Sequence, residues 1–218
     1  FRSVIHKNGK ILSFSPPKSM SVDRFTTEYN PEECSAEEFV EGTMINLFFD
    51  DTIGEDGQWE ISTKSSVGAK MTYFTSGKVD ESNTFRTMFL DVCNHAGLDF
   101  DILPRENCYT FVFQHPQNRI VIPFNDKRLY LVAAYKIDNS SYIVTEVLLS
   151  SLKKYLTPCT DIFFPESYGF DSFSDLKEKW ASENTDYKNV GVMMRHVSGA
   201  RSKFRNPNYE MVRKLRGN

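Results

Sequence analysis

The stretch Thr110-Phe111-Val112-Phe113-Gln114-His115-Pro116-Gln117-Asn118-Arg119-Ile120-Val121 organises the expected fold. Its first half is rich in aromatic and β-branched residues, which favours a strand over 109–114. The same composition returns at 119–124 and at 129–137, so we expect two further strands there. Together with the elements on either side, these strands predict an α+β fold built around antiparallel sheets.

Working outward, a hairpin is expected at the N-terminus, where Asn8-Gly9 is flanked by two strand-like runs. A longer strand with Gly42 in its middle and the run after the acidic, turn-rich segment 50–57 form a second hairpin. The strands expected outside the central stretch are 2–6, 10–14, 38–49, 59–63 and 190–196.

Helical spacing is clearest at 83–96, where four apolar residues share one face and Gly97 follows as a C-cap. That apolar face reads as core. We also expect a helix from Ser174 as N-cap, because acidic residues follow it in the first turns. The helices expected elsewhere are 145–155, 174–182 and 208–215.

Composition bounds the class of protein. The chain has 218 residues, 40% of them hydrophobic and 25% charged, which is ordinary for a globular protein and excludes a disordered one. We expect a single domain over 1–218, truncated at its N-terminus because the chain starts without Met in the middle of a strand. No apolar run approaches the ~20 residues of a membrane span, so no membrane partner is expected.

The four cysteines lack a Cys-x-x-Cys spacing, which argues against a zinc site. Reduced, mostly buried thiols and an intracellular location, cytoplasmic or nuclear, are expected. The isolated His6, His95 and His196 fit no metal spacing and are expected to be surface or structural residues.

Charge is unevenly distributed. Residues 191–218 carry seven basic side chains and one acid, a net +6, whereas the preceding 190 residues carry −9. A basic end on an acidic body suggests contact with a polyanion. The alternative is a solvated amphipathic helix.

Segments in a constant order resemble the motifs of the covalent nucleotidyltransferase superfamily, and most of all the bacteriophage-type ATP-dependent RNA ligases. Residues 38–45 are similar to the first motif, 110–121 to the third, 190–193 to the fourth and 203–209 to the fifth. Outside these motifs, 2–5, 15–19 and 61–65 resemble the strand, the lysine-bearing segment and the Thr-Lys segment of that family. The resemblance spans nearly the whole chain and implies antiparallel sheets with flanking helices around a central cleft.

The departures from the family pattern fall on its chemistry. Phe39 stands where the family has the lysine that attacks the α-phosphate of ATP. Val112 and Val190 stand where the third and fourth motifs have acidic residues. The family's reaction needs a neutral lysine as nucleophile and a divalent ion that screens the charge of the triphosphate. The three apolar residues therefore remove the nucleophile and the expected metal ligands together.

The resemblance still implies a set of site residues, with ATP as nucleotide, Mg or Mn as metal, and RNA or another polynucleotide end as partner. Glu41 would contact ribose or metal, and His115 would be a further metal or base group. The residues expected to bind the nucleotide are Glu41, Gly42, Lys64, Arg119, Lys203 and Arg205.

Three accounts of the function follow. In the first, the protein is a rewired RNA-ligase-like enzyme in which Lys18, stiffened by two preceding prolines, replaces the missing nucleophile; the alternative for Lys18 is a solvated or phosphate-contacting residue. In the second, the chain is a catalytically inactive nucleotide- or RNA-binding domain of a larger protein. A purely structural module, with Arg119 in an internal salt bridge and Tyr209 holding the last helix, is the third possibility.

Overall fold

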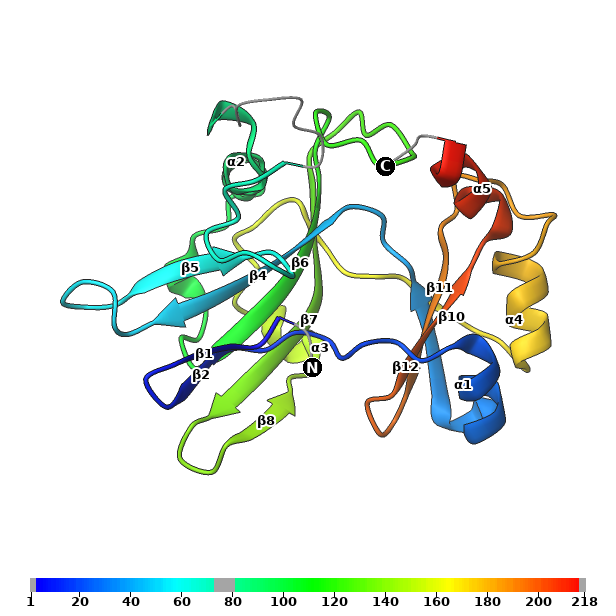
Figure 1. The fold of residues 1–218 in the computed structure, drawn as a ribbon, viewed down its shortest axis with the longest axis horizontal. Helices are drawn as coiled ribbons and strands as arrows, with labels where there is room; N and C mark the ends of the chain where they lie inside the picture. The colour runs from blue at the N-terminus through cyan, green and yellow to red at the C-terminus, as the bar shows by residue number, and fades with distance from the viewer. Residues whose placement is uncertain (1–2, 73–80, 216–218) are drawn as a thin grey trace. The chain divides into compact units, whose positions relative to one another are not determined.

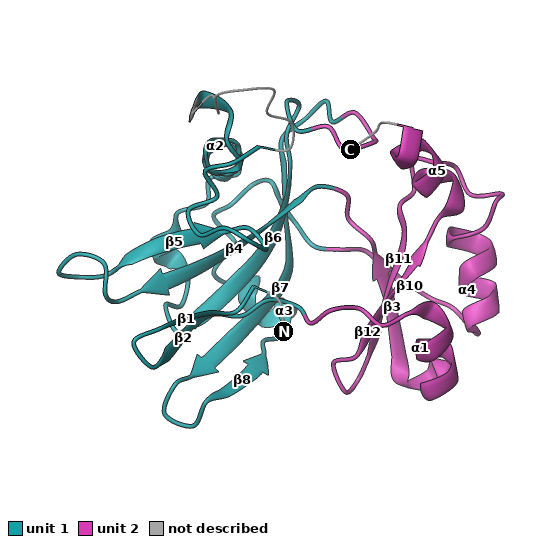
Figure 2. Ribbon diagram, in the orientation of Figure 1, with its two compact units in different colours: residues 1–16, 42–118, 124–164 teal, residues 17–41, 119–123, 165–218 magenta. Residues whose placement is uncertain are grey.

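The computed structural model describes residues 3–72 and 81–215. The chain folds into two compact units, each made of several chain segments (Figure 2). Unit 1 comprises residues 1–16, 42–118 and 124–164, and unit 2 comprises 17–41, 119–123 and 165–218. Each unit has its own sheet and its own apolar core, which gives the α+β architecture expected from the sequence. The interpretation of 1–218 as one domain with a central cleft stays a prediction.

Unit 1 is built on a six-stranded sheet with the order β5-β4-β6-β7-β8, in which β9 pairs in parallel with β7 and the other pairs are antiparallel (Figure 1). Its strands are β4 (Thr43–Asp50), β5 (Gln58–Ser62), β6 (Asn107–Gln114), β7 (Arg128–Asp138), β8 (Ile143–Glu146) and β9 (Ile162–Phe163). The strand β6 is buried along nearly its whole length because it lies between β4 and β7.

The helix α2 (Phe85–His95) packs its apolar face on this sheet and begins with a capping box between Thr84 and Thr87. Gly97 follows with a φ of +69°, as the C-cap expectation requires. The other helical segments of unit 1 are short: η2 (Glu81–Asn83), η3 (Phe100–Ile102) and α3 (Leu149–Leu152).

The N-terminal hairpin consists of β1 (Ile5–Lys7) and β2 (Lys10–Ser13). Asn8 and Gly9 adopt φ values of +51° and +79°, the left-handed conformation that a tight hairpin turn requires. The Leu12 side chain anchors the hairpin in a small apolar cluster of unit 1. The hairpin is confirmed, although Arg2 lies outside the described residues.

Unit 2 is built on a four-stranded antiparallel sheet with the order β10-β3-β11-β12. Its elements in chain order are α1 (Val22–Glu28), η1 (Pro31–Glu33), β3 (Cys34–Glu38), β10 (Ser167–Tyr168), α4 (Phe173–Trp180), β11 (Gly191–His196), β12 (Arg201–Arg205) and α5 (Pro207–Leu215). Figure 1 shows α1 and α4 on the same side of this sheet, where Phe25 and Leu176 are fully buried against it.

Four expected elements differ from the structure. The run 38–49 is divided at residues 39–42 between β3 of unit 2 and β4 of unit 1. Residues 119–124 form no strand, because the N–H groups of Val121 and Ile122 donate to the carboxylate of Glu41 instead of to a neighbouring strand.

The expected helix 145–155 and the expected N-cap Ser174 are also wrong. Residues 143–146 pair with β7 as β8, which suits their β-branched composition, and only 149–152 are helical. The helix α4 starts earlier than expected, because Ser172 rather than Ser174 accepts the capping hydrogen bond from the Asp175 N–H.

The cysteines are free thiols, as expected, and two of them are buried. Burial raises the pKa of Cys108 to about 11, and burial likewise raises the pKa of Cys93. Among the helices that the described residues form, none has the length and apolar character that crossing a membrane requires.

Candidate functional site

The sheet of unit 2 has one apolar and one basic face. Along β12, Ser202 and Phe204 are buried toward α1 and α4, and the residues between them point to the opposite face, since side chains alternate along a strand. That opposite face, which we call the basic face, carries Arg201, Lys203 and Arg205 of β12 together with Arg195 of β11. Lys203 and Arg205, in the segment that resembles the fifth motif, thus alternate along a strand, and the helix α5 follows it.

Phe39 lies directly under two of these cations. The Lys203 Nζ is 4.9 Å and the Arg205 Cζ is 5.4 Å from the centroid of its ring. A lysine at position 39 would add a third positive charge here, whereas the aromatic ring attracts both cations. The ring of Phe39 therefore stabilises the neighbouring positive charges.

An ion pair of low exposure lies on the basic face. The Arg195 Nε donates to the Glu37 Oε1 at 2.6 Å, and the two side chains are 15% and 19% exposed. Arg205, which is more exposed, pairs with Glu210 in the first turns of α5. Two of the cations of this face, Arg195 and Arg205, are thus held by carboxylates of unit 2.

Glu41 is a buried carboxylate, 7% exposed, that organises the segment 119–123. Its Oε1 accepts hydrogen bonds of 2.8 Å from the Val121 N–H and from the Tyr209 O–H. The Ile122 N–H donates to both carboxylate oxygens, at 3.3 and 3.4 Å. Glu41 therefore links the loop after β3, the segment 119–123 and α5 within unit 2.

The surroundings of Glu41 are apolar. Val190, at the position where the resemblance predicts the fourth-motif acid, packs with Val121 and Tyr209, and Phe39 lies against the same cluster. Burial, followed by the adjacent carboxylate of Glu41, raises the pKa of Tyr209, so its hydroxyl remains a neutral donor. Phe39 and Val190, two of the three positions at which the resemblance led us to expect chemical groups, thus share one apolar cluster.

Gly42 and Gly191 occupy positions that other residues fit poorly. Gly42 has a φ of +148°, and a Cβ there would lie 2.5 Å from the Phe113 carbonyl oxygen and 2.7 Å from the Val112 Cγ1. At Gly191 a Cβ would lie 2.0 Å from the Phe204 carbonyl oxygen. Glycine is required at both positions by close approach of backbone, independently of any ligand.

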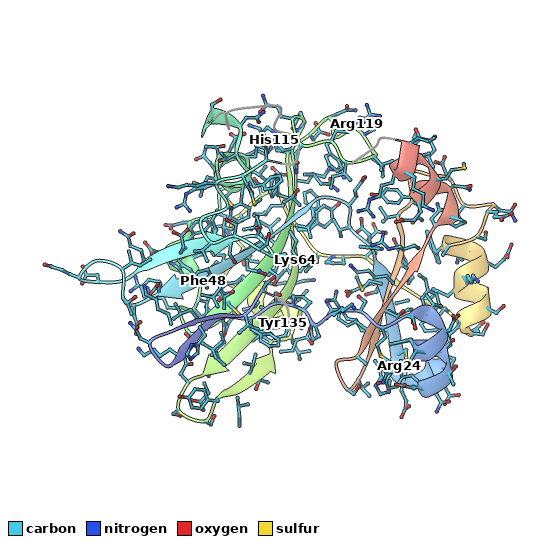
Figure 3. The ribbon with its side chains drawn as sticks, in the orientation of Figure 1. Arg24, Phe48, Lys64, His115, Arg119 and Tyr135 are labelled. Atoms are coloured by element: carbon cyan, nitrogen blue, oxygen red, sulfur yellow. The ribbon has the colours of Figure 1, made fainter. Side chains whose placement is uncertain are left out.

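His115 lies at the end of β6 beside α2 in unit 1 (Figure 3). Its Nδ1 accepts a hydrogen bond from the Gln117 N–H, and its Nε2 is 3.0 Å from the Asp91 Oδ2. The Lys127 Nζ pairs with the same carboxylate, and this contact, with a smaller contribution from His115, lowers the pKa of Asp91. Both ring nitrogens of His115 thus have partners in the folded chain.

The other predicted site residues are exposed. Lys64 follows β5 in unit 1, and its carbonyl oxygen accepts a hydrogen bond from Ser3. In unit 2 the Arg119 Nε donates to the Val121 carbonyl oxygen, while Lys18 has neither a hydrogen-bond nor an ion-pair partner within the described part of the chain. In unit 2 the structure groups Lys203 and Arg205 on the basic face and Glu41 in the adjoining apolar cluster, and in unit 1 it gives Gly42, Lys64 and His115 separate surroundings.

The described residues form no ready-made set of ligands for a divalent metal ion. Across residues 3–72 and 81–215, no three His, Cys, Asp or Glu side chains come together in an arrangement that could hold one. The oxygens of Glu41 and the nitrogens of His115 already take part in the hydrogen bonds described above. The assignment of these two residues to a metal stays a prediction.

Two features escaped the sequence interpretation. Arg195 and Arg201 join the basic face because β11 and β12 pair in register, which the local pattern does not reveal. The buried amide of Asn206 donates to the carbonyl oxygens of Thr185, Asp186 and Asn189, and its Oδ1 accepts from the Asn208 N–H. An Asn before Pro207 is a helix-start signal and would have identified this cap.

Comparison with solved structures defines the fold. Naegleria gruberi RNA ligase with pyrophosphate superimposes with a TM-score of 0.61 at 8% identity, covering 98% of this chain and 60% of that one. A variant of the same ligase with ATP and Mn gives a TM-score of 0.59 at 10% identity over 92% of this chain and 58% of the other. An apo variant gives a TM-score of 0.61 at 9% identity, covering 100% and 61%.

This chain thus has the nucleotidyltransferase fold of RNA ligases and spans about 60% of the length of the ligase chains that it matches. No family model and no curated protein sequence matches it. At these identities the likeness shows the fold alone. The family resemblance is therefore confirmed for the fold, and the individual motifs stay predictions.

Proposed function

We propose that this chain is an RNA-ligase-like protein that binds the phosphates of ATP and of RNA ends through the basic face of unit 2, without transferring a nucleotide. The observation that carries this proposal is the pair of cations, Lys203 and Arg205, over the ring of Phe39. Positive charges held at fixed positions on a strand suit phosphate groups, which supply most of the affinity for a nucleic acid.

Further observations support the proposal. The expected nucleophile is replaced by Phe39, and the described residues provide no set of metal ligands. The carboxylate of Glu41 is committed to hydrogen bonds within unit 2. The solved RNA ligase structures with pyrophosphate and with ATP and Mn show that this fold accommodates such ligands in another protein.

Short 5′-phosphorylated RNA is expected to bind with an affinity that falls steeply with salt. Lys203→Ala and Arg205→Ala should each weaken binding several-fold and reduce the slope of log K against log salt by about 0.7, the value for one lost phosphate contact on a single strand. Fluorescence anisotropy over a salt series measures both quantities.

The matched control is Arg24→Ala. Arg24 is an exposed cation of unit 2 on α1, which packs on the opposite face of the sheet (Figure 3). Its removal changes the net charge equally and should leave the affinity nearly unchanged. An RNA affinity that does not change with salt concentration, or that falls equally in all three variants, would contradict the proposal.

The rewired enzyme is the second candidate, because the ammonium of Lys18 has no partner among the described residues. It predicts that incubation with α-labelled ATP in Mg or Mn buffer leaves label on the denatured protein, and that Lys18→Ala abolishes this label. We expect no label with ATP or GTP. Nucleotide label that remains on the denatured protein and is lost in Lys18→Ala would overturn the binding proposal in favour of the enzyme.

A further inference from the structure

A groove runs along one flank of α5, between this helix and the loop 183–187 of unit 2. Its volume is about 520 Å³, and α5 contributes Asn208, Met211 and Val212 to its wall. Figure 1 draws the loop in orange beside the red α5. The groove is separate from the basic face, since its lining contains none of the residues of that face.

The wall formed by the loop is held in place by side-chain amides. The Asn208 Nδ2 donates to the carbonyl oxygens of Glu183 and Thr185, both at 2.8 Å. The Asn206 Nδ2 donates to the carbonyl oxygen of Asp186, also at 2.8 Å. A groove with walls fixed in this way can bind a partner without first ordering its own loop, which lowers the entropic cost of association.

Large apolar side chains are exposed here. Met211 is 57% exposed, and Tyr187 on the loop is 39% exposed. Along α5, Met211 and Leu215 are four residues apart and so lie on the same side of the helix, and Leu215 is 81% exposed. An apolar face that is exposed in this way is typical of an interaction site.

The negative charge of the groove favours a basic protein segment over RNA as its partner. The charged side chains that line it, Glu183 and Asp186, are both acidic. An acidic rim repels the phosphates of RNA and attracts lysine and arginine. The apolar wall requires apolar side chains on the same partner.

We propose that this groove docks an amphipathic helical segment of a protein partner, with apolar side chains against Met211 and Tyr187 and basic side chains beside Glu183 and Asp186. This is helix-in-groove recognition, in which anchors spaced three and four residues apart enter an apolar groove. The protein thus has an attachment surface distinct from the face that binds phosphates.

The test uses two fluorescent helical peptides of about 14 residues, or four turns. Both present the same stripe of leucines, and one carries lysines where the other carries glutamates. The lysine peptide should bind saturably at physiological salt and the glutamate peptide should bind at least about tenfold more weakly. Met211→Gln and the pair Glu183→Gln with Asp186→Asn should each weaken the lysine peptide about tenfold, the usual effect of losing an anchor or its paired charges.

Leu148→Gln is the matched control, because Leu148 is an apolar residue of unit 1 that is 77% exposed and lies outside the groove. It should bind the lysine peptide like the original protein. Methyl NMR locates the site: the Met211 signal should shift on binding, and that of the buried Met88 should not. Equal affinity for the two peptides, unchanged binding by Met211→Gln, or shifts that spare Met211 would each overturn the proposal.

Discussion

Gly191→Ala is expected to destabilise the protein by more than about 4 kcal/mol, an effect at the upper end for a single substitution. The added Cβ would lie 2.0 Å from the Phe204 carbonyl oxygen and 2.9 Å from the Arg205 Cα. Both are backbone atoms of β12, which pairs with β11 at this position, so relief requires the two strands to separate. The φ of +121° at Gly191 adds strain that an alanine cannot relax.

Urea unfolding followed by circular dichroism measures this loss. Gly199→Ala is the matched control, because Gly199 lies between the same two strands with a φ of +84° and has no heavy atom within 4 Å of its added Cβ. It carries the conformational cost alone, about 1–2 kcal/mol. If both variants lose the same stability, close approach of the strands is not the reason for glycine at 191.

The Gly191→Ala substitution should also disturb the basic face, because Gly191 pairs with Arg205 in the β11–β12 register. A variant that separates these strands loses the alignment of Lys203 and Arg205 over Phe39. RNA binding by Gly191→Ala should therefore fall together with its folded fraction, whereas Gly199→Ala should retain it.

Glu41→Ala is expected to cost about 2–4 kcal/mol. It leaves the Val121 and Ile122 N–H groups and the Tyr209 O–H without their acceptor in an apolar environment. Each unpaired buried donor costs roughly 1–3 kcal/mol, partly offset by relaxation and by entering water. The measurement is again the free energy of unfolding from urea titrations.

A double-mutant cycle with Tyr209→Phe isolates one of these bonds. Tyr209→Phe alone removes the hydroxyl and keeps the ring, and the two changes together should cost less than the sum of their separate effects. We expect a coupling energy of about 1–2 kcal/mol, typical of a hydrogen bond to a charged group. Additive losses would show that the carboxylate of Glu41 has a task other than holding α5 and the segment 119–123.

The local signals in the sequence were reliable where short-range physics dominates. The hairpin at Asn8-Gly9 and the helix α2 with the glycine that follows it were predicted from residues that are neighbours in the chain. The strand predicted at 119–124 was wrong because a long-range contact decides the conformation of this segment. Its composition favours a strand, but the acceptor for its N–H groups is Glu41, about 80 residues earlier in the chain.

The candidate site divides in the same way. Lys203 and Arg205 were expected because 203–209 resembles the fifth motif of the family, and their spacing on one strand places both on the same face. The contact of Phe39 with the two cations was not predicted, because the position of Phe39 in the sequence suggested only a missing nucleophile. Its contact with both cations depends on how β3 and β12 are brought together through β11.

By itself the sequence determined the class of fold, most of the strands and helices and the basic character of the last segment, because these follow from periodicity, capping and charge within short windows. Only the tertiary structure decided that Glu41 is a buried organiser, that His115 is paired with Asp91, and that Phe39 lies under two cations. These are contacts between residues far apart in sequence, whose strength depends on burial and distance.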